Sequence, residues 1–418
     1  MIEVQPLARC DAALTIPGSK SYSHRACIIA GLAEGESIIE NFLRCEDTVH
    51  TLEGLKEMGI PLSDRGESLF IQGCGGRLSG GTKEIFIGHS GTSMRFLTAL
   101  AALRRGTTLL DGSERMRKRP MAGLLEGLKG LGARAYSREV KGYPPVVVES
   151  RGLTGGTVRI EGKESSQFLS AILMIAPYAR SDVRIEVIGP LASRPYVEIT
   201  KNVMAHFGVE VWEEGGSVFG VRAGQRYVGR RYSIEGDASN ASYFFAAAAI
   251  TGGRVRVENV SPLSLQGDWG FLEILQAMGC EVTRGDFYAE VRGGSLRGLE
   301  IDMNRMPDLV PTLAVTAIFA RGKTVMRNIG HLRGKESDRI GDLAEEIRKM
   351  GISVETGPDW LSIQGGKAHG TEIDPHGDHR LAMALAIAGL KIRGIRIANE
   401  ACVAKSFPGF WETLGKLY

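Results

Sequence analysis

The sequence lacks any apolar run long enough to cross a bilayer. Its most alanine-rich apolar stretches, residues 244–250 and 381–390, are far shorter than the roughly 20 residues that a membrane helix needs. The N-terminus carries Glu3 and no basic leader, so no secretory signal is visible. These absences argue against a membrane protein and favour the cytoplasm.

Metal-binding patterns and a large excess of one charge are also missing. The six cysteines form no CxxC pair, and the HxxH string of His376 and His379 has no partner at metal spacing. The 51 basic residues nearly balance the 48 acidic ones, so the formal net charge of +3 does not by itself indicate nucleic acid. We therefore expect a monomer that needs no metal and no cofactor and binds neither nucleic acid nor a membrane.

What the sequence does contain is a sixfold repeat. A small polar or charged cluster runs into an alanine-rich helical pattern at intervals of 69 to 75 residues. The anchors of these clusters are Lys20, Gly91, Ser166, Ser239, Asp308 and His379. Because a helix N-terminus exposes unpaired N–H groups and the positive end of its dipole, each anchor is a potential anion site. Phosphate or carboxylate substrates are the natural ligands.

The rest of each repeat is equally regular. Second helices are expected to stop at Met58-Gly59, Leu131-Gly132, Phe207-Gly208, Met278-Gly279, Met350-Gly351 and Leu417-Tyr418. Between the two helices, strands are expected at residues 37–40, 107–110, 183–188, 254–257, 323–327 and 395–398. One repeat thus reads helix, strand, helix, strand, strand. An open solenoid is an alternative, but six mixed repeats in 418 residues favour two closed α/β domains of three repeats each.

The first two repeats concentrate cations at their helix starts. Residues 17–25 place Lys20 and Arg25 around a glycine turn; Ser19 or Ser21 could cap the helix, but capping does not explain two cations. The GxxxxGK[ST] spacing of an ATP-binding loop is absent. Residues 88–95 repeat the pattern and end in Arg95, while residues 114–120 hold four basic positions, of which we expect one arginine to enter a site.

The other repeats differ in chemistry. The third supplies the neutral donors Ser165, Ser166 and Gln167, whereas the fourth, with Asp237-Ala238-Ser239-Asn240, reads mostly as a structural helix cap. Further polar strings lie at Asp308 and at residues 331–339, 377–380 and 405–408. If equivalent loops open on one face of each domain, their cations could meet across a cleft.

These strings, in this order, closely resemble the EPSP synthase family of enolpyruvyl transferases. The matching strings are PGSKSYSHR, GTSMR, RMRKRP, SSQF, SRPY, EGDASNASY, MPD, KESDR, DHRLAM and KSFP, spread over residues 17–408. The resemblance implies two domains of the inside-out α/β barrel type, with the active site in the cleft between them and closure of that cleft. It assigns residues 1–13 and 236–418 to one domain, which includes the N-terminal strand, and residues 14–235 to the other.

The implied reaction belongs to the shikimate pathway of aromatic amino acid biosynthesis. It transfers the enolpyruvyl group of phosphoenolpyruvate to the 5-hydroxyl of shikimate 3-phosphate and releases phosphate. By resemblance, the residues expected at shikimate 3-phosphate are Lys20, Ser21, Arg25, Ser165, Ser166, Gln167, Ser193, Tyr196, Asp308, His331 and Lys335. Those expected at phosphoenolpyruvate are Lys20, Gly91, Arg95, Arg119, Gln167, Arg339, His379, Arg380 and Lys405.

Asp308 is the expected acceptor of the hydroxyl proton, since it is a carboxylate at a helix start amid cations; a plain helix cap is the alternative. Glu336, Lys20 and Lys405 all remain candidates for proton transfer at the methylene carbon.

Three positions depart from the family pattern. His89 and His331 stand where many members have Asn, and Phe96 stands where Pro is common. These changes leave the response to glyphosate-like inhibitors open. Two rival interpretations remain. The first is a UDP-N-acetylglucosamine enolpyruvyl transferase, but the cysteine-containing loop of that enzyme is not visible between Gly106 and Pro120. The second is an RNA-terminal phosphate cyclase-like protein, which would not need these strings.

Overall fold

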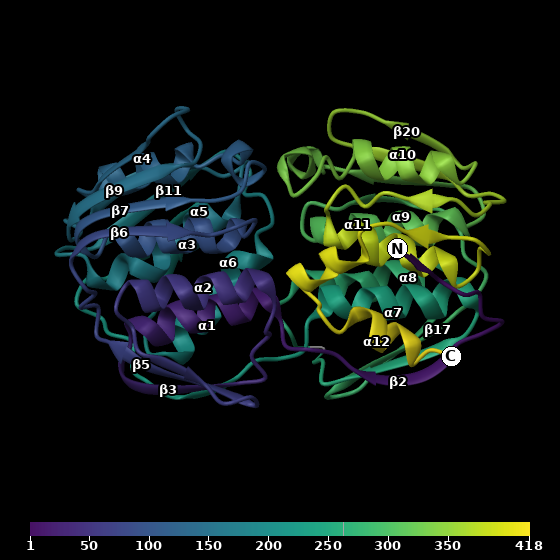
Figure 1. Cartoon of the computed structure of the whole chain (residues 1–418), viewed down its shortest axis with the longest axis horizontal. Coiled ribbons are helices and arrows are strands. Elements are labelled where there is room, and N and C mark those ends of the chain that lie inside the picture. Colours follow the sequence, from purple (N-terminus) through teal and green to yellow (C-terminus); the bar gives the residue numbers. More distant parts are fainter. Residues whose placement is uncertain (262) are drawn as a thin grey trace. The chain divides into compact units, whose positions relative to one another are not determined.

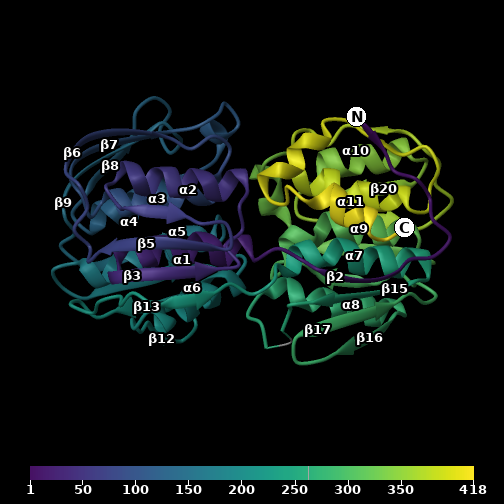
Figure 2. The same ribbon diagram turned by 60° about the horizontal axis from the view of Figure 1, so that its bottom comes forward.

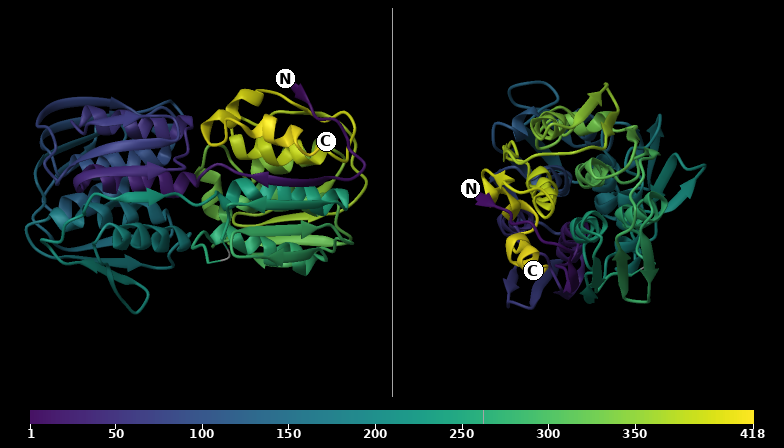
Figure 3. Two further views of the ribbon diagram at one scale, coloured as in Figure 1. Left: turned by 90° about the horizontal axis from the view of Figure 1, so that it is seen from below. Right: turned by 90° about the vertical axis from the view of Figure 1, so that its right-hand side faces the viewer.

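The structure is a computed structural model that describes residues 1–261 and 263–418. The chain forms two compact units: unit 1 holds Met1–Pro17 and Glu235–Tyr418, and unit 2 holds Gly18–Ile234. The chain therefore passes from one unit to the other twice, after Pro17 and after Ile234. Both termini lie in unit 1 (Figure 3).

Unit 2 contains three four-stranded sheets among the described residues. Each has one parallel pair followed by two antiparallel pairs. In sheet order they are β14 (Arg231–Ser233), β3 (Glu34–Glu40), β5 (Ser68–Cys74) and β4 (Leu62–Asp64); β6 (Gly81–Phe86), β7 (Arg105–Asp111), β9 (Val146–Arg151) and β8 (Arg134–Ser137); and β10 (Gly156–Glu161), β11 (Val183–Ile188), β13 (Val218–Val221) and β12 (Trp212–Glu214).

Unit 1 repeats this plan with one shorter sheet. Its purple strand β2, from the start of the chain, lies beside teal β15 (Figure 2), to which it pairs in parallel. The sheets are β2 (Asp11–Thr15), β15 (Arg254–Glu258), β17 (Tyr288–Arg292) and β16 (Glu281–Arg284); β18 (Glu300–Asp302), β19 (Lys323–Arg327), β21 (Leu361–Gln364) and β20 (Ser353–Thr356); and β22 (Glu372–Ile373), β23 (Arg396–Ile397) and β1 (Ile2–Glu3).

Each unit encloses three helices that are buried along nearly their whole length. They are α1 (Lys20–Leu32), α3 (Gly91–Ala101) and α5 (Ser166–Ile175) in unit 2, and α7 (Ala238–Thr251), α9 (Val310–Ile318) and α11 (His379–Gly389) in unit 1. Beyond their polar starts, their sequences are largely apolar all round, as expected of helices that are covered on every side. In Figure 1 these helices lie inside the sheets of their own unit.

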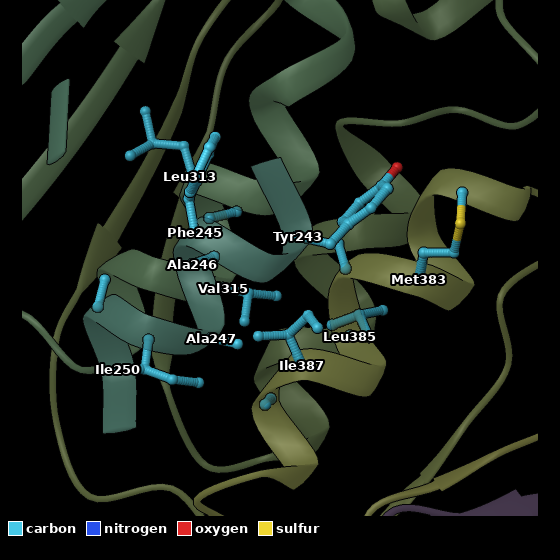
Figure 4. Close-up of a cluster of buried hydrophobic side chains, with 14 of the residues drawn as sticks. Tyr243, Phe245, Ala246, Ala247, Ile250, Leu313, Val315, Met383, Leu385 and Ile387 are labelled. Carbon is cyan, nitrogen blue, oxygen red and sulfur yellow. The ribbon is translucent and has the colours of Figure 1, made fainter. Parts of the chain in front are cut away.

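The buried helices of unit 1 pack directly against one another. Ala247 of α7, Val315 of α9 and Ile387 of α11 are all fully buried, and their side chains meet in Figure 4. Small alanine side chains allow this close approach. The N-termini of the three helices, which carry the polar anchors, are thereby brought together.

Six further helices lie outside the buried ones and are only partly buried. They are α2 (Glu46–Glu57), α4 (Ala122–Gly130), α6 (Pro195–His206), α8 (Phe271–Met278), α10 (Gly341–Lys349) and α12 (Phe410–Gly415). Short 3-10 turns complete the structure: η1 (Met116–Lys118), η2 (Ala176–Tyr178), η3 (Gly267–Gly270), η4 (Pro307–Leu309), η5 (Gly330–Gly334) and η6 (Glu400–Lys405).

Most of the element predictions are confirmed. All six predicted strands between the paired helices exist, as β3, β7, β11, β15, β19 and β23. Gly59 and Gly351 adopt φ angles of 86° and 84°, the left-handed conformation that ends a helix. One prediction is wrong: the last helix ends at Gly415 rather than Leu417, because the chain closes it with short turns.

No helix in the described part of the chain is both long and apolar enough to span a membrane.

Candidate active site

The first anion-binding candidate lies at the start of α1. Lys20 is the first residue of the helix, and its Nζ is 3.2 Å from Oδ2 of the buried Asp47 on α2. Ser19 occupies the N-cap position but makes no side-chain capping bond, so the expectation that a serine caps this helix is wrong for Ser19. The polar residues at this end are therefore available for a role other than capping.

Arg25, one turn further along α1, is buried among neutral oxygens. Its Nε donates to Thr200 Oγ1 at 2.6 Å, its Nη1 to the Ser21 carbonyl at 2.9 Å, and its Nη2 to the Tyr196 carbonyl at 3.1 Å and Ser170 Oγ at 3.4 Å. The ring of Phe96, a departure from the family pattern, lies 5.2 Å from the guanidinium carbon. Burial lowers the pKa of Arg25 to about 10. No carboxylate in the described residues binds this cation.

Two further guanidinium groups converge on Gly91, the first residue of α3. A Cβ atom at this position would lie 2.4 Å from Nη1 of Arg119 and 2.6 Å from Nη1 of Arg95, so a side chain here would displace both guanidinium groups. Arg95 also donates to Gln167 Oε1 at 3.2 Å, and Gln167 Nε2 donates to Thr92 Oγ1 at 3.0 Å. The starts of α3 and α5 and the segment after η1 thus share one polar cluster.

The predicted serine and tyrosine ligands of unit 2 border this region. Ser165 caps α5 by accepting a hydrogen bond from the Gln167 N–H at 3.2 Å, while Ser166 is buried at the first helical position. Ser193 adopts a left-handed φ of 55° immediately before α6, and Tyr196 lies in the first turn of that helix. Because the Tyr196 carbonyl accepts from Arg25, the start of α6 is tied to α1.

Unit 1 carries a carboxylate between two guanidinium groups. Asp308 lies in η4, directly before α9; its Oδ1 accepts from Arg339 Nη1 at 2.9 Å and its Oδ2 from Arg380 Nη2 at 2.7 Å. The N-cap position of α9 is Leu309, so Asp308 is not the cap of that helix. The prediction of a carboxylate amid cations is confirmed, and the plain-cap alternative is wrong.

Arg339 is the centre of this network. Besides Asp308, it donates to Asp378 Oδ2 at 2.7 Å and to Glu336 Oε2 at 2.8 Å. Burial alone would lower the pKa of Arg339, but the negative charges of Asp378, Glu336 and Asp308 outweigh burial and raise it. The guanidinium is therefore held firmly in its charged form.

Lys405, His331 and His379 complete the predicted residues of unit 1. Lys405 is buried at the end of η6, and its Nζ is 3.8 Å from Oε1 of Glu336. Burial and the nearby Lys335 cation lower the pKa of His331 to about 4, so this ring is neutral at pH 7. His379 is fully buried at the first position of α11. The Nε2 atom of His376 lies 3.0 Å from Oε1 of Glu346, so the two histidines of the HxxH string have different surroundings.

Both units thus place cations and hydroxyl donors at the starts of buried helices, and unit 1 adds a carboxylate held by two arginines. A family profile described as EPSP synthase (3-phosphoshikimate 1-carboxyvinyltransferase) matches residues 4–414. The chain belongs to the EPSP synthase family.

Individual relatives are similar to this chain along nearly its whole length. A 3-phosphoshikimate 1-carboxyvinyltransferase of Nostoc punctiforme is 46% identical over 98% of this chain and 97% of its own length. One from Syntrophobacter fumaroxidans is 45% identical over 99% of both chains. The solved structure of EPSP synthase from Acinetobacter baumannii superposes with a TM-score of 0.84 at 30% identity, covering 99% of this chain and 97% of that one. The two-domain α/β fold predicted from the sequence is confirmed.

The sequence strings did not assign a role to the carboxylates that hold these cations. Asp378 binds Arg339 and also caps α11 by accepting from the Arg380 N–H at 2.9 Å; Asp47 binds Lys20. The available signal for Asp378 was its place directly before His379 and Arg380 at a helix start. For Asp47 the signal was a charged residue that recurs at the second loop of each repeat, at Asp47, Arg119, Arg194, Asp268, Glu336 and Lys405, but this recurrence indicated no partner for it.

Asp268 was also missed, because the fourth repeat reads as mostly structural. Asp237 does cap α7, accepting from the Asn240 N–H at 2.9 Å, as that interpretation requires. Yet Ser239 Oγ donates to Oδ2 of the buried Asp268, and burial together with the charge of Asp308 raises the pKa of Asp268 to about 7. The fourth repeat therefore contributes a carboxyl that interacts electrostatically with the Asp308 site.

Proposed function

We propose that this chain is a 3-phosphoshikimate 1-carboxyvinyltransferase that transfers the enolpyruvyl group of phosphoenolpyruvate to shikimate 3-phosphate and releases phosphate. Membership of the EPSP synthase family over residues 4–414 supports the reaction. The observation that carries the assignment is Arg25, a buried guanidinium that binds four neutral oxygens and no carboxylate in the described chain. Because a buried charge without a counter-ion is costly, this position suits an anionic substrate.

Shikimate 3-phosphate is assigned to a set of donors from both units. Arg25 binds it together with the hydroxyl and amide groups around the starts of α1, α5 and α6. In unit 2 the set is Lys20, Ser21, Arg25, Ser165, Ser166, Gln167, Ser193 and Tyr196; in unit 1 it is Asp308, His331 and Lys335. The neutral His331 ring suits a hydrogen bond to a hydroxyl better than a contact with a second cation.

Phosphoenolpyruvate is assigned to the arginine-rich positions. Arg95 and Arg119 converge on Gly91, which places two guanidinium groups at the start of α3. Arg339, Arg380, His379 and Lys405 form the unit 1 set, while Lys20 and Gln167 serve both substrates. Arginine is suited to this task because its planar fork binds carboxylate and phosphate groups through paired hydrogen bonds.

Asp308 accepts the proton of the attacking 5-hydroxyl in this proposal. Two guanidinium groups hold its oxygens, which fixes the carboxylate in one orientation. The hydroxyl oxygen then attacks the central carbon of phosphoenolpyruvate while the methylene carbon gains a proton and becomes a methyl group. The resulting tetrahedral adduct loses phosphate together with one proton of that methyl group, which restores the carbon–carbon double bond of the enolpyruvyl product. Lys20, Glu336 and Lys405 are the candidates for the proton at the methylene carbon, and the 3.8 Å Lys405–Glu336 pair makes these two a plausible relay.

The deciding experiment measures phosphate release from phosphoenolpyruvate by the purified protein with each of two acceptors. We expect release with shikimate 3-phosphate and none without an acceptor. Equal release with UDP-N-acetylglucosamine, or none with either acceptor, would contradict the proposal.

The domain limits, the cytoplasmic location and the monomeric state belong to the same proposal. We assign residues 1–13 with 236–418 and residues 14–235 to the two domains of the enzyme; the compact units, whose bounds differ by at most a few residues, support this division. Light scattering on the purified chain tests the monomer: a mass near 45.1 kDa is expected, and twice that mass contradicts it.

A further inference from the structure

A hollow of about 830 Å³ opens on the three-stranded part of the sheet formed by β7, β9 and β8 in unit 2. These strands can be followed in Figure 2. Four arginines line the hollow: Arg105 at the start of β7, Arg134 at the start of β8, Arg151 at the end of β9, and Arg180 beyond η2. The single acidic residue among its lining side chains is Glu149.

The sheet itself brings these charges together. Arg105 is directly opposite Arg151 in the antiparallel β7–β9 register, and Arg134 is directly opposite Glu149 in the β8–β9 register. Side chains on a strand alternate between faces, so Arg151 and Glu149 of β9 project to the same side of the sheet. Like charges directly opposite each other destabilise a sheet. The Arg105–Arg151 pair is thus a local conflict within an otherwise regular sheet.

Glu149 does not resolve that conflict. Its Oε2 accepts from Arg134 Nη1 at 2.9 Å, and its Oε1 accepts from the Tyr136 hydroxyl at 2.9 Å. Arg105, Arg151 and Arg180 form no side-chain hydrogen bond and no ion pair with any residue in the described ranges 1–261 and 263–418. The positive charges of Arg105 and Arg151, opposite each other in the sheet, therefore repel each other without a carboxylate between them.

This hollow is separate from the proposed substrate site. That site uses the N-terminal end of α3, at Gly91 and Arg95, whereas Arg105 follows the C-terminal end of the same helix. Eleven residues of helix span about 16 Å. None of the four arginines of the hollow belongs to the residues assigned to either substrate.

We propose that the hollow binds a small, multiply charged, phosphate-bearing anion at a second site. Three guanidinium groups offer paired donors for phosphate oxygens, and a ligand carrying two phosphate groups would neutralise the Arg105–Arg151 repulsion and reach Arg180. The volume is within the range of small-molecule sites. Because the arginines are exposed, binding weakens as salt increases.

Calorimetric titration with inorganic pyrophosphate tests the site. The test variant is the double substitution Arg105→Gln and Arg151→Gln; the matched control is Arg159→Gln, an exposed arginine of the neighbouring sheet that is paired with Glu186. We expect the wild-type chain and the control to share a binding component that the double variant loses, or binds at least 10-fold more weakly. That component should also persist when shikimate 3-phosphate is present at saturation.

Phosphate release by the double variant should remain at the wild-type rate, which separates this site from the substrate site. If the double variant does not fold, Arg180→Gln, outside the sheet, takes its place with the same expectation. Equal pyrophosphate binding by wild type, test variant and control overturns the proposal.

Discussion

Arg25 in unit 2 and Arg339 in unit 1 are both buried arginines beside the start of a buried helix, yet their surroundings are opposite. Arg25 binds hydroxyl and carbonyl oxygens, and burial lowers its pKa to about 10. Arg339 binds Asp308, Glu336 and Asp378, which together raise its pKa in spite of burial. The first cation has room for a negative ligand, whereas the second already has its counter-ions.

This contrast divides the proposed work between the units. A guanidinium without a counter-ion contributes net positive charge for binding an anionic substrate. A guanidinium shared among three carboxylates contributes little net charge, but it fixes the position of the groups that move protons. In this proposal Arg25 serves substrate binding alone, whereas Arg339 belongs to the phosphoenolpyruvate set and also holds the carboxylates Asp308 and Glu336 in place.

The largest expected effect follows from Asp308→Asn, which removes the charge of one carboxylate at Arg339 without changing its shape. Because the hydroxyl proton then has no acceptor, kcat for phosphate release should fall by roughly 10² to 10⁴. Asp302→Asn, at an exposed strand position of the same unit, is the control and should change kcat by less than about twofold. An Asp308→Asn enzyme with kcat within fivefold of wild type would remove Asp308 from the mechanism.

Arg339→Gln tests whether the unit 1 cation is held by its carboxylates. The substitution leaves three acidic side chains around one neutral amide, so the free energy of unfolding should fall by about 3–5 kcal/mol. Arg333→Gln, which breaks the partly exposed pair with Asp338 and the hydrogen bonds to the Gly357 and Pro358 carbonyls, should lower it by clearly less, about 1 kcal/mol. Urea denaturation of both variants measures the difference, and equal losses would mean that the buried network adds no stability.

Asp268→Asn tests the electrostatics of unit 1 through the pH dependence of the free energy of unfolding. The native carboxyl, with a pKa of about 7, keeps its proton at pH values where the unfolded chain has lost it, so wild-type stability falls as pH rises from about 4 to 7. Asn cannot ionise, so the variant should gain stability relative to wild type across that range, by roughly 3–4 kcal/mol. Thermal denaturation between pH 4 and 8 checks this.

The exposed Asp286→Asn is the control for that series and should give a flat difference from wild type. A flat profile for Asp268→Asn as well would mean that Asp268 ionises normally in the folded chain.

Among these substitutions, Arg25→Gln should have the smallest effect. Unlike Arg339→Gln, it should weaken substrate binding more than it lowers the free energy of unfolding. The lost hydrogen bonds destabilise the variant, but removal of a buried charge that has no carboxylate partner offsets part of that loss, so the free energy of unfolding should fall by less than for Arg339→Gln. Affinity for shikimate 3-phosphate should nevertheless fall about 10- to 100-fold, the range for loss of a charge-assisted contact. Calorimetry on the folded variant measures affinity, with Arg44→Gln at an exposed ion pair as control.

An Arg25→Gln protein that is strongly destabilised but keeps its affinity would reverse the interpretation of Arg25. It would then be a structural residue, and the contrast with Arg339 would concern stability alone.

Local patterns predicted the elements of this chain well. The alanine-rich pattern of residues 381–390, after the polar anchor His379, predicts a helix that begins near this anchor, and α11 spans His379–Gly389. Strand periodicity likewise located β11 at Val183–Ile188. Such predictions succeed because helix and strand periods, caps and glycine stops are written in neighbouring residues. Polar anchors at helix starts, such as Lys20 and Gly91, follow from the same local rules.

The pairings within the site could not be predicted in this way. The neutral partners of Arg25 lie 145 to 175 residues away in sequence, apart from Ser21, and Asp378 is separated from Arg339 by 39 residues. Asp268 looked like an ordinary loop acid because its raised pKa comes from burial and from Asp308, neither of which its neighbours in sequence reveal.

The sequence by itself determined the sixfold repeat, the two-domain α/β class and the residues that resemble the EPSP synthase family. Only the tertiary structure decided which cation receives carboxylates and which is left among neutral oxygens. The physical reason is that periodicity is a local property of the chain, whereas the electrostatic state of a buried charge depends on every group that folding brings within a few ångströms of it.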